Sequence, residues 1–178
     1  MSSDEPKGVP FTPALSLSVD EWSLELFEVL RAWPAATLGI WTRWDPGYLL
    51  LEIDCIENNP VERIILYTAD EELTVEFGYW ETHLPGPLGT GDADVAGTAQ
   101  QAKSLVEDWL SGRIRTAVFS DGAGKWCGSK LIEGDDILSQ LTTDWISSFG
   151  PTQVEIRTPQ RVDWRRFSLE NGEITETT

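Results

Sequence analysis

The segment from residue 37 to residue 84 constrains the fold most, because its apolar residues alternate with polar ones and turn-forming residues interrupt it at short intervals. Apolar side chains at every second position are typical of a strand with one buried face. The turn signals are Asp45-Pro46-Gly47, Asn58-Asn59-Pro60 and Ala69-Asp70-Glu71. They divide the segment into four predicted strands, at about 37–44, 48–57, 61–68 and 72–84. Because the connections are short, we expect an antiparallel meander.

The strand at 72–84 is predicted to be the central one. If it runs unbroken, one of its faces begins with apolar residues and ends on a carboxylate and the only histidine in the chain. The residues of that face are Leu73, Val75, Phe77, Tyr79, Glu81 and His83. The opposite face then carries Thr74, Glu76 and Trp80.

Helical spacing of apolar residues predicts three helices. The first begins at Ser18, which forms a capping box with Glu21. The second begins with a cap at Asp94 or Thr98 and ends at Gly112. The third is predicted over residues 135–149 and is followed by the helix-terminating pair Gly150-Pro151.

The remaining segments predict a second set of strands, at 113–120, 125–132, 153–157 and 162–169. The predicted fold class is therefore α+β: an antiparallel β-meander sheet with about three packed helices in a single domain. A chain of 178 residues is an ordinary length for one domain. We predict that the domain covers residues 18–170, between a flexible lead-in at 1–17 and a short polar tail at 171–178.

The charge of the chain favours some partners and excludes others. Thirty acidic residues against 13 basic ones give a net charge of −17 at pH 7. Such a field repels nucleic acids and anionic membranes, so we expect neither as a partner, and it attracts a basic protein. The same composition also serves solubility or adaptation to salt. The N-terminus lacks a secretory pattern and the chain has only two cysteines, which predicts a cytoplasmic location.

The sequence contains no recognisable catalytic motif. A single histidine excludes a multi-histidine zinc site, no EF-hand loop is present, and no metal or cofactor is predicted. Glu81 and His83 have the i, i+2 spacing of an acid/base pair on one strand face. They support an alternative reading, a small-molecule enzyme or binding domain whose site comprises Tyr79, Glu81, His83, Asp92 and Asp94.

Four of the nine arginines lie within ten residues near the C-terminus, at Arg157, Arg161, Arg165 and Arg166. In a chain of net charge −17 we interpret them as counter-charges for acidic neighbours.

The acidic α+β character, the Trp-rich meander and the segment Phe77-Gly78-Tyr79-Trp80-Glu81-Thr82-His83 resemble the immunity proteins of bacterial polymorphic-toxin and contact-dependent inhibition systems. The resemblance implies a non-catalytic inhibitor that neutralises a basic protein partner such as a toxin domain. Acidic and aromatic side chains would then cover the active site of the toxin or a neighbouring surface. The residues predicted to form that surface are Glu52, Asp54, Glu76, Trp80 and Glu81.

Overall fold

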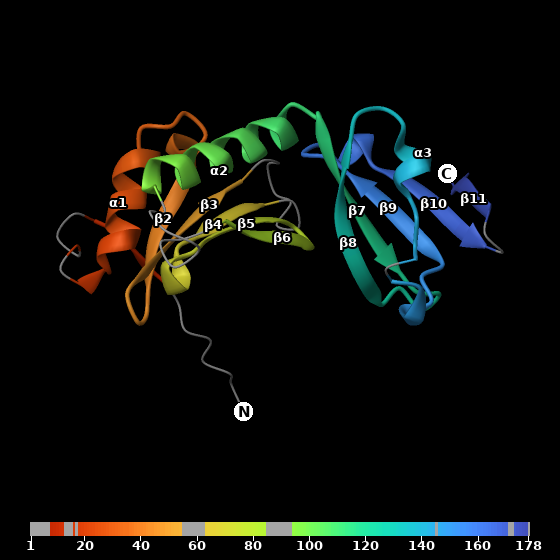
Figure 1. Ribbon diagram of the computed structural model, residues 1–178, viewed down its shortest axis with the longest axis horizontal. Helices are drawn as coiled ribbons and strands as arrows, with labels where there is room; N and C mark the ends of the chain where they lie inside the picture. The colour runs from red at the N-terminus through yellow and green to blue at the C-terminus, as the bar shows by residue number, and fades with distance from the viewer. Residues whose placement is uncertain are drawn as a thin grey trace. The chain divides into compact units, whose positions relative to one another are not determined.

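The alternating segment builds a six-stranded antiparallel sheet in which the strands lie in chain order (Figure 1). Its strands are β1 (Val9–Pro10), β2 (Gly39–Trp44), β3 (Tyr48–Ile53), β4 (Ile64–Tyr67), β5 (Leu73–Phe77) and β6 (Trp80–Leu84). β1 lies within the segment predicted as a lead-in and pairs with β2. The predicted meander is therefore confirmed, with β1 added at its start and the last predicted strand divided into β5 and β6.

The computed structural model describes residues 8–12, 16, 18–54, 63–84, 94–144, 146–170 and 173–177. These residues form two compact units, the first comprising residues up to 76 together with 81–104, and the second comprising 77–80 together with 105 onward. Both units contain an antiparallel sheet and helical residues, which confirms the predicted α+β class. The predicted domain boundaries at residues 18 and 170 stay predictions.

The strand predicted at 72–84 is two strands, β5 and β6, which are the last two in the sheet order, so the prediction of a central strand is wrong and the predicted faces change as well. The chain turns at Gly78 and Tyr79, between the end of β5 and the start of β6. Gly78 has φ +60°, a conformation that glycine adopts without a steric penalty at a hairpin turn. A two-residue turn places Phe77 and Trp80 on the same face, and their rings stack with centroids 5.5 Å apart. Trp80 therefore does not share a face with Glu76, as an unbroken strand requires.

Helix α1 (Glu21–Leu30) begins two residues later than the predicted capping box. Asp20 is the N-cap, and its carboxylate accepts a hydrogen bond from Ser23 N at 2.8 Å. The capping box predicted at Ser18 is therefore wrong, because the Asp20 carboxylate caps the first turn instead. Two short 3₁₀ helices, η2 (Ala36–Leu38) and η4 (Ala69–Glu71), lie in the connections of this unit.

Helix α2 (Val95–Leu110) has both of its predicted ends. The Asp94 carboxylate accepts from Ala96 N at 3.0 Å, and Gly112 ends the helix with φ +74°. In the first unit α2 lies beside α1, since Lys103 Nζ donates to Val29 O at 3.2 Å.

The core of the first unit lies between the two helices and one face of the sheet. The predicted apolar stripe of α1 is buried at Trp22, Leu26 and Leu30. The sheet contributes Leu49, Leu51, Ile53, Ile64, Leu66, Leu73 and Val75. Trp41 belongs to this side, with its ring 5.1 Å from that of Phe27, whereas Trp44 lies on the opposite face, as alternation along β2 predicts.

The second unit contains a five-stranded antiparallel sheet of order β11-β10-β9-β7-β8. Its strands are β7 (Ile114–Ser120), β8 (Trp126–Glu133), β9 (Gln153–Arg157), β10 (Arg165–Glu170) and β11 (Glu173–Thr177). The 3₁₀ helix η6 (Arg161–Asp163) precedes β10. β11 extends through much of the predicted polar tail, of which residues 171, 172 and 178 lie outside the described residues.

The third predicted helix is much shorter than its apolar spacing indicates. Helix α3 covers only Ile137–Gln140, and the 3₁₀ helix η5 (Ser147–Phe149) follows after a non-helical stretch. Ile137 and Leu141 are buried, but Leu138 and Phe149 are exposed, so one continuous apolar stripe does not form. Trp145, within the predicted helix at 135–149, lies outside the described residues.

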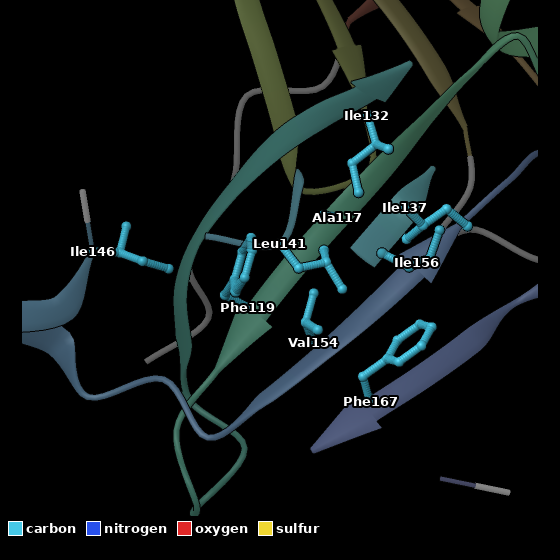
Figure 2. Close-up of a cluster of buried hydrophobic side chains, with 9 residues drawn as sticks. All are labelled: Ala117, Phe119, Ile132, Ile137, Leu141, Ile146, Val154, Ile156 and Phe167. Atoms are coloured by element: carbon cyan, nitrogen blue, oxygen red, sulfur yellow. The ribbon is translucent and has the colours of Figure 1, made fainter. Parts of the chain in front are cut away.

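One face of the second sheet packs against α3 and the segment after it. Figure 2 shows this core, formed by Ala117, Phe119, Ile132, Ile137, Leu141, Ile146, Val154, Ile156 and Phe167. Thr116 and Val118 lie on the opposite face of β7 and are also buried. Strand β7 is therefore covered on both sides.

Among the helices of the described residues, none has the length and apolar character needed to cross a bilayer.

Candidate functional site

One face of the first sheet packs against helices, and the other carries a band of acidic and aromatic side chains that we call the acidic face. Alternation along β3 separates its buried residues from this face, because Leu49, Leu51 and Ile53 point to the core. No helix of the first unit, in the ranges that the structure describes, covers the acidic face (Figure 1). The acidic face comprises Ile40, Thr42, Trp44, Tyr48, Leu50, Glu52, Ile65, Tyr67, Thr74, Glu76, Glu81 and His83.

Two glutamates of the acidic face lie next to each other on β5 and β6. The two-residue turn after Phe77 aligns Glu76 with Glu81 and Thr74 with His83. The contact of 2.9 Å between Thr74 Oγ1 and His83 Nδ1 fits this register. Directly opposed like charges destabilise a pair of strands, so Glu76 and Glu81 repel each other.

Glu76 is only partly exposed, and its pKa is raised above the ordinary value of 4.5, first by burial and then by the charge of Glu81. Burial disfavours a carboxylate because it removes water from the charge. Among the described residues, no lysine, arginine or histidine forms an ion pair with Glu76 or Glu81. The acidic face therefore holds two neighbouring carboxylates that lack a compensating positive charge.

Tyr67 lies beside these glutamates and completes the polar part of the face. Its pKa is raised, first by burial, while a hydrogen bond with Thr74 acts in the opposite direction and the charges of Glu76 and Glu81 raise it further. Burial and the two neighbouring glutamates thus keep the Tyr67 hydroxyl protonated, so that it can donate a hydrogen bond. His83, also on this face, has its Nδ1 3.4 Å from Glu72 Oε2.

On β3 of the acidic face, Glu52 already has a positive partner. Arg63 forms an ion pair with Glu52, and Arg63 Nε lies 3.5 Å from Asp54 Oδ1. Ile65 pairs with Glu52 across β3 and β4. The charges of Glu52 and Asp54 are therefore partly neutralised within the chain, whereas those of Glu76 and Glu81 are not.

Of the five residues predicted to bind a partner, Glu52, Glu76 and Glu81 share the acidic face, and Asp54 directly follows β3 beside Arg63. Trp80 lies on the opposite face, with its ring stacked on Phe77. The residues predicted to bind a partner did not include Tyr48, Tyr67 and Thr74, although Thr74 was predicted to share a face with Glu76. Tyr67 was missed because β4 is apolar at successive positions, a pattern that indicates burial on both sides.

The residues of the alternative small-molecule site make separate contacts. Glu81 and His83 lie on the acidic face, whereas Asp94 caps α2 and Asp92 lies outside the described residues. The Tyr79 ring lies 5.0 Å from the Arg157 guanidinium, in the second unit. In the part of the chain that the structure describes, no three side chains of His, Cys, Asp or Glu gather as metal ligands. The small-molecule site stays a prediction.

The arginines near the C-terminus do neutralise acidic neighbours. The Glu155 carboxylate accepts hydrogen bonds from Arg157 Nε and Arg166 Nε, each at 2.7 Å. Arg165 pairs with Glu176 on the other face of the same sheet, with its Nε 2.7 Å from Oε1. The predicted role as counter-charges is confirmed for these three arginines.

Comparison of the chain with protein-family models, with curated proteins and with solved structures finds no match.

Proposed function

We propose that the chain is a non-catalytic binding protein and that its acidic face binds a positively charged protein surface. The observation that carries the proposal is the pair Glu76 and Glu81, adjacent carboxylates without a positive partner among the described residues. An arginine or lysine placed between them by a partner would remove their repulsion and form charge-assisted hydrogen bonds.

The surroundings of the pair favour a protein as the partner. Ile40, with 66% of its surface exposed, lies in the same row as Glu52. Aromatic side chains beside acidic ones, here Tyr48 and Tyr67, are typical of the residues that dominate protein interfaces. The net charge of −17 would accelerate encounter with a basic partner.

Inhibition is the activity that fits this kind of binding best. A protein that covers a basic active site with acidic and aromatic side chains blocks access of the substrate, and it needs no catalytic group of its own. The resemblance to bacterial toxin-immunity proteins points in the same direction, with a basic toxin domain as the partner.

The test begins with affinity purification from the native host and identification of basic proteins that co-purify. Each purified candidate is then titrated with the wild-type chain, with the Glu76→Gln/Glu81→Gln variant and with a Glu21→Gln/Glu25→Gln control. The control removes the same number of charges from helix α1, away from the acidic face. We expect the first variant to bind at least about tenfold more weakly than the control and to inhibit the partner less. Equal affinities for the two variants would refute the role of the acidic face.

Ionic strength provides a second measurement. Association steered by charge slows as salt rises, because salt screens interactions beyond about 10 Å at 0.1 M. We expect the association rate of the wild-type chain to fall steeply with salt and that of the Glu76/Glu81 variant to fall less. A rate independent of salt would contradict attraction by charge.

A further inference from the structure

The second unit contains a groove on the face of its sheet opposite the core of Figure 2. The groove has a volume of about 440 Å³, within the range of small-molecule sites. Residues that alternate with the core residues line it: Val118, Glu155 and Arg166 form one row across β7, β9 and β10. We call it the aromatic groove, after the two aromatic side chains, Tyr79 and Trp126, that border it.

Both aromatic side chains are half exposed, Trp126 at 52% and Tyr79 at 51%. Val118 is buried and contributes an apolar floor. Large aromatic surfaces left open beside an apolar floor can stack on a planar ring and remove it from water. The aromatic groove therefore favours a ligand that contains an aromatic ring.

The charged side chains of the groove favour an anion. Glu155 is largely buried and binds both Arg157 and Arg166, so the three side chains carry one net positive charge. Arg157 is also fixed by rings, with its guanidinium 5.0 Å from Tyr79 and 4.4 Å from Trp164. The Arg166 side chain is 65% exposed, lines the groove and uses its Nε on Glu155, and its terminal N–H groups are further donors suited to an anion.

We propose that the aromatic groove binds a small aromatic anion, with the ring on Trp126 and the anionic group on Arg166. Trp126 is on β8 and Arg166 is on β10, three strand spacings or about 14 Å apart between backbones, so the ring and the anionic group of the ligand are several bonds apart. A nucleoside monophosphate and an arylalkyl carboxylate both have this form. A long polyanion is disfavoured, because one local positive charge does not offset a net charge of −17.

Isothermal titration calorimetry on the full chain tests the proposal with two probes. Adenosine monophosphate carries a phosphate and indole-3-propionate carries a carboxylate, and adenosine and indole-3-propionamide are their neutral counterparts. We expect at least one anionic probe to bind with a Kd of about 1 mM or tighter, and its neutral counterpart to bind about tenfold more weakly. Whichever probe binds more tightly identifies the anionic group.

The variants Arg166→Ala and Trp126→Ala are each expected to weaken binding about tenfold. Arg165→Ala and Leu138→Ala are matched controls, because these exposed side chains lie on the other side of the same unit, and they are expected to bind as the wild type does. Circular dichroism confirms that each variant is folded. The proposal fails if neither anionic probe binds, if the neutral counterparts bind equally well, or if Arg166→Ala and Trp126→Ala leave the affinity unchanged.

Discussion

Glu76 and Glu81 lie side by side on adjacent antiparallel strands, and the pKa of Glu76 is raised, first by burial and then by the negative charge of Glu81. The arrangement opposes folding of the isolated chain, since each carboxylate weakens the other. Binding sites commonly retain such local conflicts, because a partner can relieve them.

Replacement of Glu81 by glutamine is expected to stabilise the protein. The change removes the repulsion across β5 and β6 and should raise the free energy of unfolding by about 0.2–1 kcal/mol at neutral pH. Urea denaturation measures it. Glu25→Gln, which removes an exposed charge from helix α1, controls for the change in net charge. Equal stabilisation by both variants would show that the net charge, and not the pair, is responsible.

Glu76 should make stability depend on pH with a defined sign. Because its pKa in the folded state is raised above the ordinary value of 4.5, the folded protein holds this proton more tightly than the unfolded chain does. The destabilisation of the folded state by ionised Glu76 is therefore absent below that ordinary value and grows as pH rises from it through the raised pKa. We expect the unfolding free energy of the wild type, relative to that of Glu76→Gln, to fall as pH rises from about 4 to about 7. A difference that does not vary with pH would contradict the raised pKa.

Thr68 joins helix α1 to the sheet and is expected to be costly to replace. Its Oγ1 accepts from Leu49 N at 3.0 Å and shares a short hydrogen bond with Ser23 Oγ, and all of these groups are buried. Thr68→Val keeps the shape but leaves the buried Leu49 N without its acceptor, whereas Ser23 Oγ keeps its hydrogen bond to Asp20 Oδ2. The loss at Leu49 N should lower the free energy of unfolding by about 1–3 kcal/mol. Thr37→Val, at an exposed threonine, should have a smaller effect in the same denaturation experiment.

Glu155 is expected to stabilise the second unit through its two arginines. Glu155→Ala leaves Arg157 and Arg166 without their shared carboxylate and should cost about 1–3 kcal/mol of unfolding free energy. Glu176→Ala removes the exposed pair with Arg165 and should change stability much less. Thermal denaturation of both variants checks the prediction, and similar losses in the two would contradict it.

Much of the fold could be predicted from the sequence because the relevant signals are local. Turn residues and period-two alternation identified the meander, and Asp94 and Gly112 marked the ends of α2. The boundaries of β9 match the predicted strand at 153–157. Each of these features depends on residues close together in the chain, so a sequence pattern is sufficient to locate them.

The third helix shows where local patterns fail. Its apolar residues have helical spacing, yet only Ile137–Gln140 is helical, and the exposed Leu138 and Phe149 have no core to contact. A short helical segment gains little stability from its own hydrogen bonds, so packing decides its length. The burial of both faces of β7 likewise depends on partners far along the chain.

For the candidate site, the sequence by itself determined the ingredients: an acidic chain, the glutamates of β3, β5 and β6, and an isolated histidine. Only the tertiary structure decided which of them share a face. A two-residue turn at Gly78 exchanges the faces that an unbroken strand would present, so Glu81 joins Glu76 while Trp80 joins Phe77. The physical reason is that side chains alternate with a period of two, and one turn between strands resets that alternation for every residue that follows.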